Sequence, residues 1–433
     1  MTVRVDAVVI GAGIIGASVA LELARSGRSV VCVDRGPAPG AGSTSASSAL
    51  IRFSYSTPDA VLTAWESAPH WERWSEHLGT VDPNGMVSFV RTGMLIFDAP
   101  SGTMPRVTAL WDEIGVPYER LHTDALAARY PGLDLGSYFP PKPIDDPAFA
   151  DDSTSNLSAV FDPNAGYVDD PLLAAHNVAF AARAHGAEIL LRRRVVEVLF
   201  RERRVSGVRL DDDSVLEAPV VVNAAGPHSA ALNRLAGADR DMRIGHRALR
   251  QEVFTAPAPA TLVPTAELPI VVDLDLGQYF RGQPGDLLLV GGTEPECDPM
   301  EWIDDADRFD EHCTVARFET TMLRLARRVP DFGVPIRPTG LAALYDVADD
   351  WVPIYDASCV PGWFMACATS GNQFKNAPLA GKFMVSIIES VERGASHDED
   401  PVQFPGARTG RHINLGAFSR LRNPTLTSGT VMG

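Results

Sequence analysis

Gly11, Gly13 and Gly16 constrain the fold of this chain most, because they lie between two apolar runs that begin at Val8 and end at Asp34. A strand, a glycine turn and a helix in this order can bind a diphosphate at the helix N-terminus. Gly11 permits the tight turn, Gly13 permits close approach of the backbone, and Gly16 permits close packing of helix on strand. Asp34 follows about twenty residues later, where a carboxylate accepts both ribose hydroxyls. An acid there disfavours a 2′-phosphate, so the pattern predicts a site for FAD or NAD rather than NADP.

Composition bounds the class of protein. The chain has 433 residues, of which 45% are hydrophobic, so it can bury a large core and is expected to form two domains. A formal net charge of −17 argues against a nucleic-acid partner. The five cysteines are odd in number and show no CxxC spacing, which favours neither disulfides nor zinc and suggests a cytoplasmic protein. No segment approaches the roughly eighteen apolar residues of a membrane span, so none is expected.

Periodicity predicts the main elements. Helices are expected at 57–78, 171–185, 308–328 and 379–393. Strands are expected at 87–97, 188–191, 195–200, 205–210 and 218–222, with a further block of strands over 249–291. The polar tail after residue 396 contains the segment 414–433, which is expected to be an arm or partly disordered.

Strand-turn-helix units at both ends of this pattern predict an α/β fold in two domains. The cofactor-binding domain would be assembled from discontinuous segments, and the inserts would form a second, β-rich substrate domain that covers the cofactor. The expected ranges are 1–90, 151–230 and 331–395 for the first domain, 91–150 and 231–330 for the second, and 396–433 for a C-terminal tail.

Three further motifs follow the glycine fingerprint, at 221–227 (VVNAAGP), 291–293 (GGT) and 369–375 (TSGNQFK). In this order they resemble the D-amino-acid-oxidase superfamily of FAD amine oxidoreductases, of the monomeric sarcosine oxidase, glycine oxidase and dimethylglycine dehydrogenase type. The resemblance covers about residues 3–393. It implies FAD rather than NAD, a Rossmann-like FAD-binding domain, and a substrate domain with a large mixed β-sheet. The cofactor-binding positions are then Gly11, Gly13, Ile14, Ile15, Gly16, Asp34, Arg35, Ser43, Thr44, Ser45, Val196, Ala224, Ala225, Gly226, Gly371, Asn372, Gln373, Phe374 and Lys375.

Arg52 and Lys375 are the candidate substrate ligands. Their segments resemble those in which sarcosine oxidase carries its two carboxylate contacts, and a planar guanidinium can grip both carboxylate oxygens. An exposed arginine and a solvated lysine at a helix start are the alternatives. Tyr345 and Tyr55 are expected to line the substrate pocket, unless they are simply core residues. Arg281 is an alternative clamp, that is, an alternative side chain to bind the substrate carboxylate, unless it is a solvated arginine of a hairpin.

Three absences separate this sequence from the proteins that it resembles. Ala343 aligns with the cysteine that links flavin in sarcosine oxidase, and the loop 43–47 lacks the linking histidine of dimethylglycine dehydrogenase, so noncovalent FAD is expected. Leu289 aligns with the lysine that promotes oxygen reduction, which favours a dehydrogenase over an oxidase. His228 and His246 are possible acid or base groups, although histidines in such segments are more often structural.

The resemblance therefore implies oxidation of the C–N bond of a small amino acid, with an N-methyl or other secondary amine favoured. Hydride would pass to flavin N5, and the resulting imine would hydrolyse. The expected partners are the amino-acid-like substrate and either oxygen or a protein electron acceptor, and an oligomer is possible. Two alternatives stay open, an FAD-dependent 2-hydroxy-acid or polyol-phosphate dehydrogenase and a noncatalytic FAD-binding assembly factor.

Overall fold

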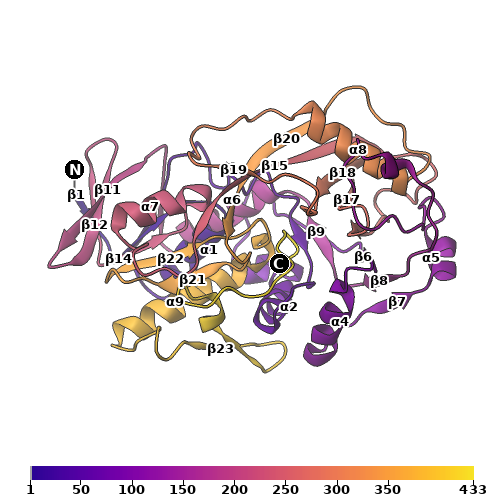
Figure 1. Cartoon of the computed structure of the whole chain (residues 1–433). Helices are drawn as coiled ribbons and strands as arrows, with labels where there is room; N and C mark the ends of the chain where they lie inside the picture. The colour runs from indigo at the N-terminus through magenta and orange to yellow at the C-terminus, as the bar shows by residue number, and fades with distance from the viewer. Residues whose placement is uncertain (1) are drawn as a thin grey trace.

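A six-stranded sheet forms around the glycine fingerprint in the computed structural model, which describes residues 2–433 (Figure 1). In spatial order the strands are β10 (Glu188–Leu191), β3 (Val30–Asp34), β2 (Ala7–Ile10), β14 (Val220–Asn223), β22 (Trp363–Cys367) and β21 (Ile354–Ala357). All neighbours pair in parallel except β21, which is antiparallel to β22. All four residues of β2 are buried, as expected for a parallel strand covered on both faces.

Two layers enclose this sheet. Helix α1 (Ile14–Arg25) contacts both α6 (Pro171–Ala184) and α9 (Ala377–Glu392), and the three helices pack with one face of the sheet. A four-stranded sheet covers the other face and shares its core. Its strands are β1 (Thr2–Arg4), β13 (Val215–Glu217), β12 (Arg204–Leu210) and β11 (Val195–Arg201). The arrangement confirms the expected Rossmann-like domain built from discontinuous segments.

The second domain contains a nine-stranded mixed sheet beside the first (Figure 1). Its path is β19 (Glu301–Ile303), β15 (His246–Pro257), β18 (Leu287–Gly292), β17 (Gln278–Gln283), β16 (Ile270–Asp273), β6 (Met94–Phe97), β8 (Ala159–Asp162) and β7 (Glu119–Leu121), and β20 (Gly340–Ala348) pairs with β15. Helix α8 (Val315–Arg328) packs its apolar side on one face. The large mixed sheet and the two-domain α/β class are thus confirmed.

Smaller elements complete the molecule. Strands β4 (Leu50–Ile51), β9 (Gly166–Val168) and β5 (Phe89–Val90) form a three-stranded sheet, and β23 (Gln403–Pro405) pairs with β24 (His412–Asn414). The remaining helices are α2 (Pro58–Glu72), α3 (Trp74–Leu78), α4 (Thr103–Ile114), α5 (Thr123–Arg129), α7 (Ser229–Ala236) and the 3₁₀ turns Pro147–Ala150, Gly226–His228, Phe374–Asn376 and Leu415–Phe418. Among residues 2–433, no helix has the length and apolar character needed to cross a membrane.

The structure differs from the expected elements in three places. The helix expected at 57–78 is divided at Arg73, which has non-helical dihedrals. The helix expected from residue 308 begins only after Thr314, whose hydroxyl accepts the Arg317 N–H as an N-cap. Strands β8 and β20 lie in the nine-stranded sheet, although the sequence ranges put them in the FAD-binding domain. The other domain boundaries stay a prediction.

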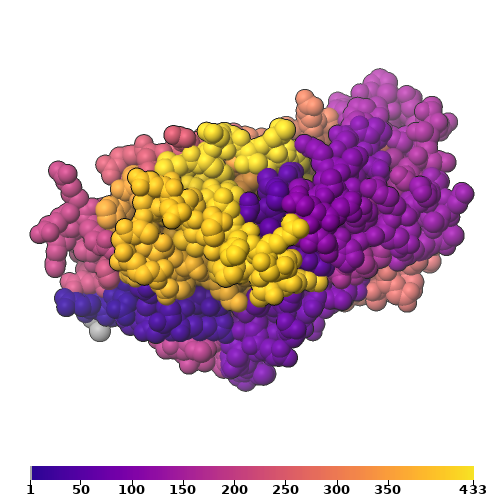
Figure 2. Space-filling view, turned by 90° about the horizontal axis from the view of Figure 1, so that it is seen from below, coloured from indigo at the N-terminus to yellow at the C-terminus, as the bar shows by residue number. Residues whose placement is uncertain are grey.

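The C-terminal segment is not a free arm, so the expectation for residues 414–433 is wrong. Arg420 is buried and pairs with Asp241, Asp356 and Asp398 at 2.6–3.1 Å. Figure 2 shows the yellow C-terminal residues spread over one face of the molecule, next to purple residues of the N-terminal third. The polar composition that suggested disorder consists in part of charged side chains that anchor the segment.

Candidate active site

A cavity of about 1150 Å³ extends between the two domains. Residues of the glycine fingerprint line it together with residues of β17 and β20 from the nine-stranded sheet. Its volume exceeds the roughly 300–1,000 Å³ typical of pockets for drug-sized ligands. The cavity therefore has room for a dinucleotide together with a small substrate.

The N-terminus of α1 opens onto this cavity. Gly13 is the N-cap and supplies no side-chain bond, while Ile14 donates its backbone N–H to Thr44 Oγ1 at 3.1 Å. A Cβ on Gly13 would lie 3.1 Å from the same oxygen, so a side chain would crowd the approach to the helix. Uncapped first-turn N–H groups and the helix dipole suit a diphosphate. The site therefore fits the diphosphate of FAD.

Asp34 ends β3 at the cavity wall. Its Oδ2 accepts the Ala12 N–H at 2.6 Å, and its Oδ1 accepts the Gly36 N–H at 2.6 Å. Each carboxylate oxygen can accept more than one hydrogen bond. The two backbone bonds thus hold the carboxylate in one orientation without using all of its capacity to accept ribose hydroxyls.

Most of the predicted cofactor positions line this one cavity. They are Gly11, Gly13, Ile14, Ile15, Asp34, Arg35, Ser43, Thr44, Ser45, Ala224, Ala225, Gly226, Gly371, Asn372, Gln373, Phe374 and Lys375. Gly16 is used in packing instead, since a Cβ there would lie 1.9 Å from the Gly11 carbonyl oxygen. Val196 is 44% exposed and is not among the residues that line the cavity, whereas its neighbour Val195 is, so the cofactor contact of Val196 stays a prediction.

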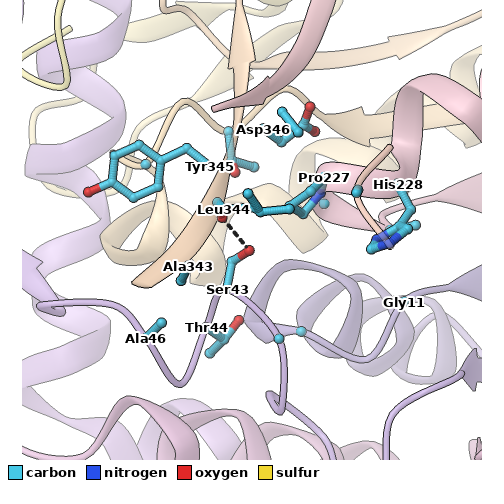
Figure 3. A pocket seen from close by; sticks show the side chains of 18 of the residues that line it. Gly11, Ser43, Thr44, Ala46, Pro227, His228, Ala343, Leu344, Tyr345 and Asp346 are labelled. Atoms are coloured by element: carbon cyan, nitrogen blue, oxygen red, sulfur yellow. Dashed lines mark hydrogen bonds between the residues drawn. The ribbon is translucent and has the colours of Figure 1, made fainter. Parts of the chain in front are cut away.

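The loop at 43–47 faces the strand β20 across the cavity. Ser43 Oγ donates to the Leu344 carbonyl oxygen at 2.6 Å, and Figure 3 shows this bond beside Ala343 and Tyr345. Within the described residues, none of the five cysteines lines the cavity. Ala343, which the sequence analysis aligned with a flavin-linking cysteine, lines the cavity on β20.

The two histidines that line the cavity are both hydrogen-bonded. His228 Nε2 pairs with Asp307 at 3.0 Å, and burial, followed by the charges of Arg35 and Arg194, lowers its pKa to about 4. His246 Nδ1 pairs with Asp346 at 2.7 Å. Burial alone would lower the pKa of His246, but the Asp346 carboxylate outweighs it and raises that pKa well above 6.5. His246 is thus held as a partner of Asp346 rather than as a free base.

Arg52, Tyr55 and Lys375 form a buried cluster at the other end of the cavity. Lys375 Nζ donates to Tyr55 Oη at 2.9 Å and to the Asn372 carbonyl oxygen at 2.8 Å. The Arg52 guanidinium lies over the Tyr55 ring, 4.6 Å from its centroid. The exposed fractions are 4% for Arg52, 2% for Tyr55 and 3% for Lys375. The structure therefore brings together three side chains that the sequence analysis assigned to the substrate, from positions far apart in the chain. Arg52, Lys375 and the predicted Tyr345 line the cavity, whereas Tyr55 is not among its lining residues and contacts Lys375 from behind it.

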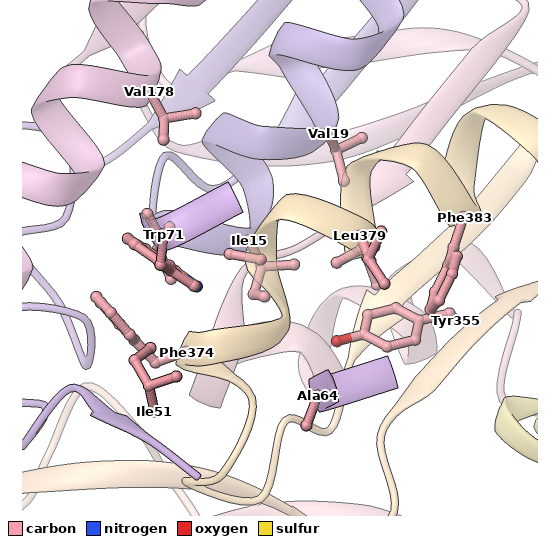
Figure 4. Packing of buried hydrophobic residues seen from close by; sticks show 14 of the residues in the cluster. Ile15, Val19, Ile51, Ala64, Trp71, Val178, Tyr355, Phe374, Leu379 and Phe383 are labelled. Atoms are coloured by element: carbon pink, nitrogen blue, oxygen red, sulfur yellow. The ribbon is translucent and has the colours of Figure 1, made fainter. Parts of the chain in front are cut away.

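The turn that carries Lys375 is held in place by Trp71. Trp71 Nε1 donates to the Lys375 carbonyl oxygen at 2.7 Å, and the Phe374 ring stacks on Trp71 with centroids 5.2 Å apart (Figure 4). Gly371 has a φ of +66°, and a Cβ there would lie 2.5 Å from the Tyr345 ring. Glycine is required at this point because Tyr345 approaches the backbone so closely.

The cluster of Arg52, Tyr55 and Lys375 contains two basic side chains and no acidic one. No ion pair within residues 2–433 involves Arg52 or Lys375. Burial, followed by the Arg52 charge, lowers the pKa of Lys375 well below 10.5, and burial also lowers the pKa of Arg52. Buried cations without an acid partner indicate a place for an anion.

Arg281 does not join this cluster. It is 4% exposed, but its guanidinium lies 3.9 Å from the centre of the Tyr167 ring, and its residue is not among those that line the cavity. The position of Arg281 offers no support for its role as an alternative clamp.

The sequence analysis missed several residues at the site. Val431 and Met432 line the cavity, Glu294 accepts the Val431 N–H at 3.0 Å, and Tyr279 Oη is 2.6 Å from Ser48 Oγ. Asp307 pairs with Arg35 and with Arg194 near the expected ribose position. Backbone contacts of Val431 and Met432 leave no signature in a sequence, whereas Glu294 directly follows the glycine-glycine-threonine motif that had been noted.

Comparisons with known proteins agree with this geometry. The FAD dependent oxidoreductase family, DAO, matches residues 6–387. The chain is 24% identical to glycine oxidase of Geobacillus kaustophilus over 405 residues, which cover 90% of this chain and 95% of that protein. It is 25% identical to FAD-dependent oxidoreductase domain-containing protein 1 of Xenopus laevis, over 89% of this chain and 79% of that protein.

Solved structures share the fold. The crystal structure of L-proline dehydrogenase from P. horikoshii superposes with a TM-score of 0.72 at 21% identity, covering 93% of this chain and 98% of that one. One conclusion follows from the glycine motif, the N-terminus of α1 without a side-chain N-cap, the Asp34 carboxylate and the family match over most of the chain. This chain belongs to the DAO family of FAD-dependent oxidoreductases.

Proposed function

We propose that this chain oxidises the C–N bond of a small amino acid, with an N-methyl or cyclic secondary amine as the preferred substrate. The observation that carries the proposal is the pair of buried basic side chains, Arg52 and Lys375, which have no acid partner among residues 2–433 and line the same cavity as the cofactor cradle. Relatives that are named for oxidising glycine and proline support the amino-acid class.

The protein's own residues would bind and orient the substrate. Arg52 and Lys375 would hold the carboxylate, and Tyr55 would fix the lysine through its hydroxyl. Tyr345 and Tyr279 line the wall of the cavity and would exclude water from the amine. When bound, FAD supplies a two-electron acceptor for the hydride that leaves the carbon, and the resulting imine hydrolyses. A neutral amine needs no strong general base for this step, which agrees with the pairing of His246 to Asp346.

Anaerobic reduction of the FAD-loaded protein tests the proposal. A panel of N-methyl amino acids, proline, primary amino acids and 2-hydroxy acids is added to separate samples, and loss of the oxidised flavin absorbance is followed. Fastest bleaching by a secondary amino acid supports the proposal. Bleaching by hydroxy acids alone would show a 2-hydroxy-acid dehydrogenase, and FAD binding without reduction by any compound would favour a noncatalytic role.

A further inference from the structure

Residues 428–433 occupy the place expected for a substrate carboxylate. Val431 and Met432 line the cavity, and their carbonyl oxygens accept hydrogen bonds from Arg52, at 2.7 Å from Nη2 and 3.1 Å from Nη1. Two oxygens that accept from the two terminal nitrogens of one guanidinium reproduce the contacts of a bidentate carboxylate. The backbone of this segment therefore stands where the proposed function puts the substrate.

The tip of the segment is held by two further hydrogen bonds and by close packing against Tyr55. Val431 donates its N–H to Glu294 Oε2 at 3.0 Å, and Ser56 Oγ donates to the Gly433 carbonyl oxygen at 2.5 Å. Gly433 has a φ of +84°, and a Cβ there would lie 2.6 Å from the Tyr55 ring. Close contact with Tyr55 thus requires glycine at this position.

The base of the segment is anchored independently of the cavity. Arg422 pairs with Asp350 at 2.7 Å, and Thr427 Oγ1 donates to the Asp350 carbonyl oxygen at 2.9 Å. Residues before 428 can therefore stay in place while the tip moves. Met432 is buried, but Gly429 is exposed and a Cβ there would meet nothing within 4 Å.

We propose that residues 428–433 form a strap that competes with the substrate carboxylate for Arg52 and leaves Arg52 when substrate binds. This inference rests on the proposed function. In the absence of substrate the strap supplies the acceptor for Nη2 of the buried Arg52, whereas Nη1 also donates to the Ser54 carbonyl oxygen and to Ser54 Oγ. A carboxylate adds a full negative charge and can pair bidentately with the guanidinium, so it can displace the neutral carbonyls of the strap where a neutral ligand cannot. The strap would thereby select anionic ligands.

A matched pair of glycine substitutions tests the strap. Gly433→Ala places a Cβ against Tyr55, whereas Gly429→Ala places one in open space, and both glycines have positive φ, +84° and +67°. The probe is benzoate, titrated into the FAD-loaded protein by calorimetry. We expect Gly433→Ala to bind benzoate more tightly by about tenfold, the equivalent of roughly one net hydrogen bond, and Gly429→Ala to bind as the wild type does.

A chain that stops at Thr427 gives a second measurement. It should bind benzoate at least as tightly as Gly433→Ala and should retain FAD. Equal benzoate affinity in all four proteins would overturn the strap while leaving the carboxylate site intact. Weaker binding after removal of the strap would overturn it as well, because the segment would then be part of the binding wall. No benzoate binding by any of them would refute the carboxylate site and the strap together.

Discussion

Lys375 Nζ and Tyr55 Oη lie 2.9 Å apart, although 320 residues separate them in the chain. The hydrogen bond joins the turn before α9 to the segment before α2, and it places an ammonium group beside the Arg52 guanidinium without an intervening acid. This juxtaposition is the physical basis for assigning an anionic substrate.

Arg52→Lys should weaken binding of the substrate carboxylate, because lysine keeps the charge but loses the planar fork. Removing the guanidinium in Arg52→Ala should cost about 2–5 kcal/mol, as for other truncated buried charge pairs. Reductive half-reaction kinetics give the substrate Kd and the reduction rate separately. Arg281→Lys is the matched control, because Arg281 is equally buried at 4% exposure but lies away from the cavity. If Arg281→Lys weakened binding and Arg52→Lys did not, the clamp would be Arg281.

Carboxylate binding should depend on pH through Lys375. Burial and the Arg52 charge lower the pKa of Lys375 well below 10.5, so the lysine of the free protein loses its proton at a lower pH than an ordinary lysine. A bound carboxylate favours the ammonium form, and binding therefore takes up a proton above that lowered pKa. Affinity for benzoate should decrease as pH rises above the lowered pKa of Lys375, by up to about tenfold per pH unit. Lys375→Met should bind more weakly and show a flat profile; a wild-type slope in this variant would assign the titration to another group.

FAD should be bound noncovalently. Ala343 and the loop 43–47 offer neither a cysteine nor a histidine, and both cavity histidines are hydrogen-bonded to acids. Acid precipitation should leave all yellow colour in the supernatant, and colour in the pellet would contradict this. Asp34→Ala should weaken FAD binding through loss of the ribose contacts, and Asp34→Asn, which keeps one acceptor, should weaken it less.

The parts of the site that the sequence predicted are those fixed by local geometry. Gly11 has a φ of +106°, which favours glycine, Gly13 leaves room at the helix start, and Lys375 follows a turn with a recognisable order of residues. Val195 rather than Val196 lines the cavity, and an apolar run does not reveal which of two neighbouring strand residues faces a cavity. The contacts of Val431 and Met432 are made by main-chain carbonyls, which every residue possesses, so no side-chain pattern could predict them.

Reduced enzyme should react slowly with oxygen and quickly with an artificial or protein acceptor. Leu289 in β18 is buried in the apolar core, at the position aligned with the oxygen-activating lysine, and so supplies no charge to stabilise superoxide. Arg281, which lies opposite Leu289 on the neighbouring strand β17, places its guanidinium over the Tyr167 ring. Stopped-flow mixing of the reduced protein with oxygen measures the rate, and reoxidation as fast as in efficient oxidases would argue against a dehydrogenase.

Stability of the substrate domain should depend on Arg328. Its side chain is fully buried and bonds to Asp273 at 2.8 Å and to Asp275 at 3.0 Å. Arg328→Met removes the cation but leaves two buried carboxylates, which should lower the free energy of unfolding by about 3–5 kcal/mol. Arg129 provides the control, since its pair with Glu119 at 3.1 Å has side chains 41% and 56% exposed, and Arg129→Met should change stability by less than about 1 kcal/mol. Urea unfolding followed by fluorescence measures both variants. Adding Asp273→Asn and Asp275→Asn to Arg328→Met should recover part of the loss, because the buried charges are then removed; no recovery would mean that the cost comes from packing rather than from charge.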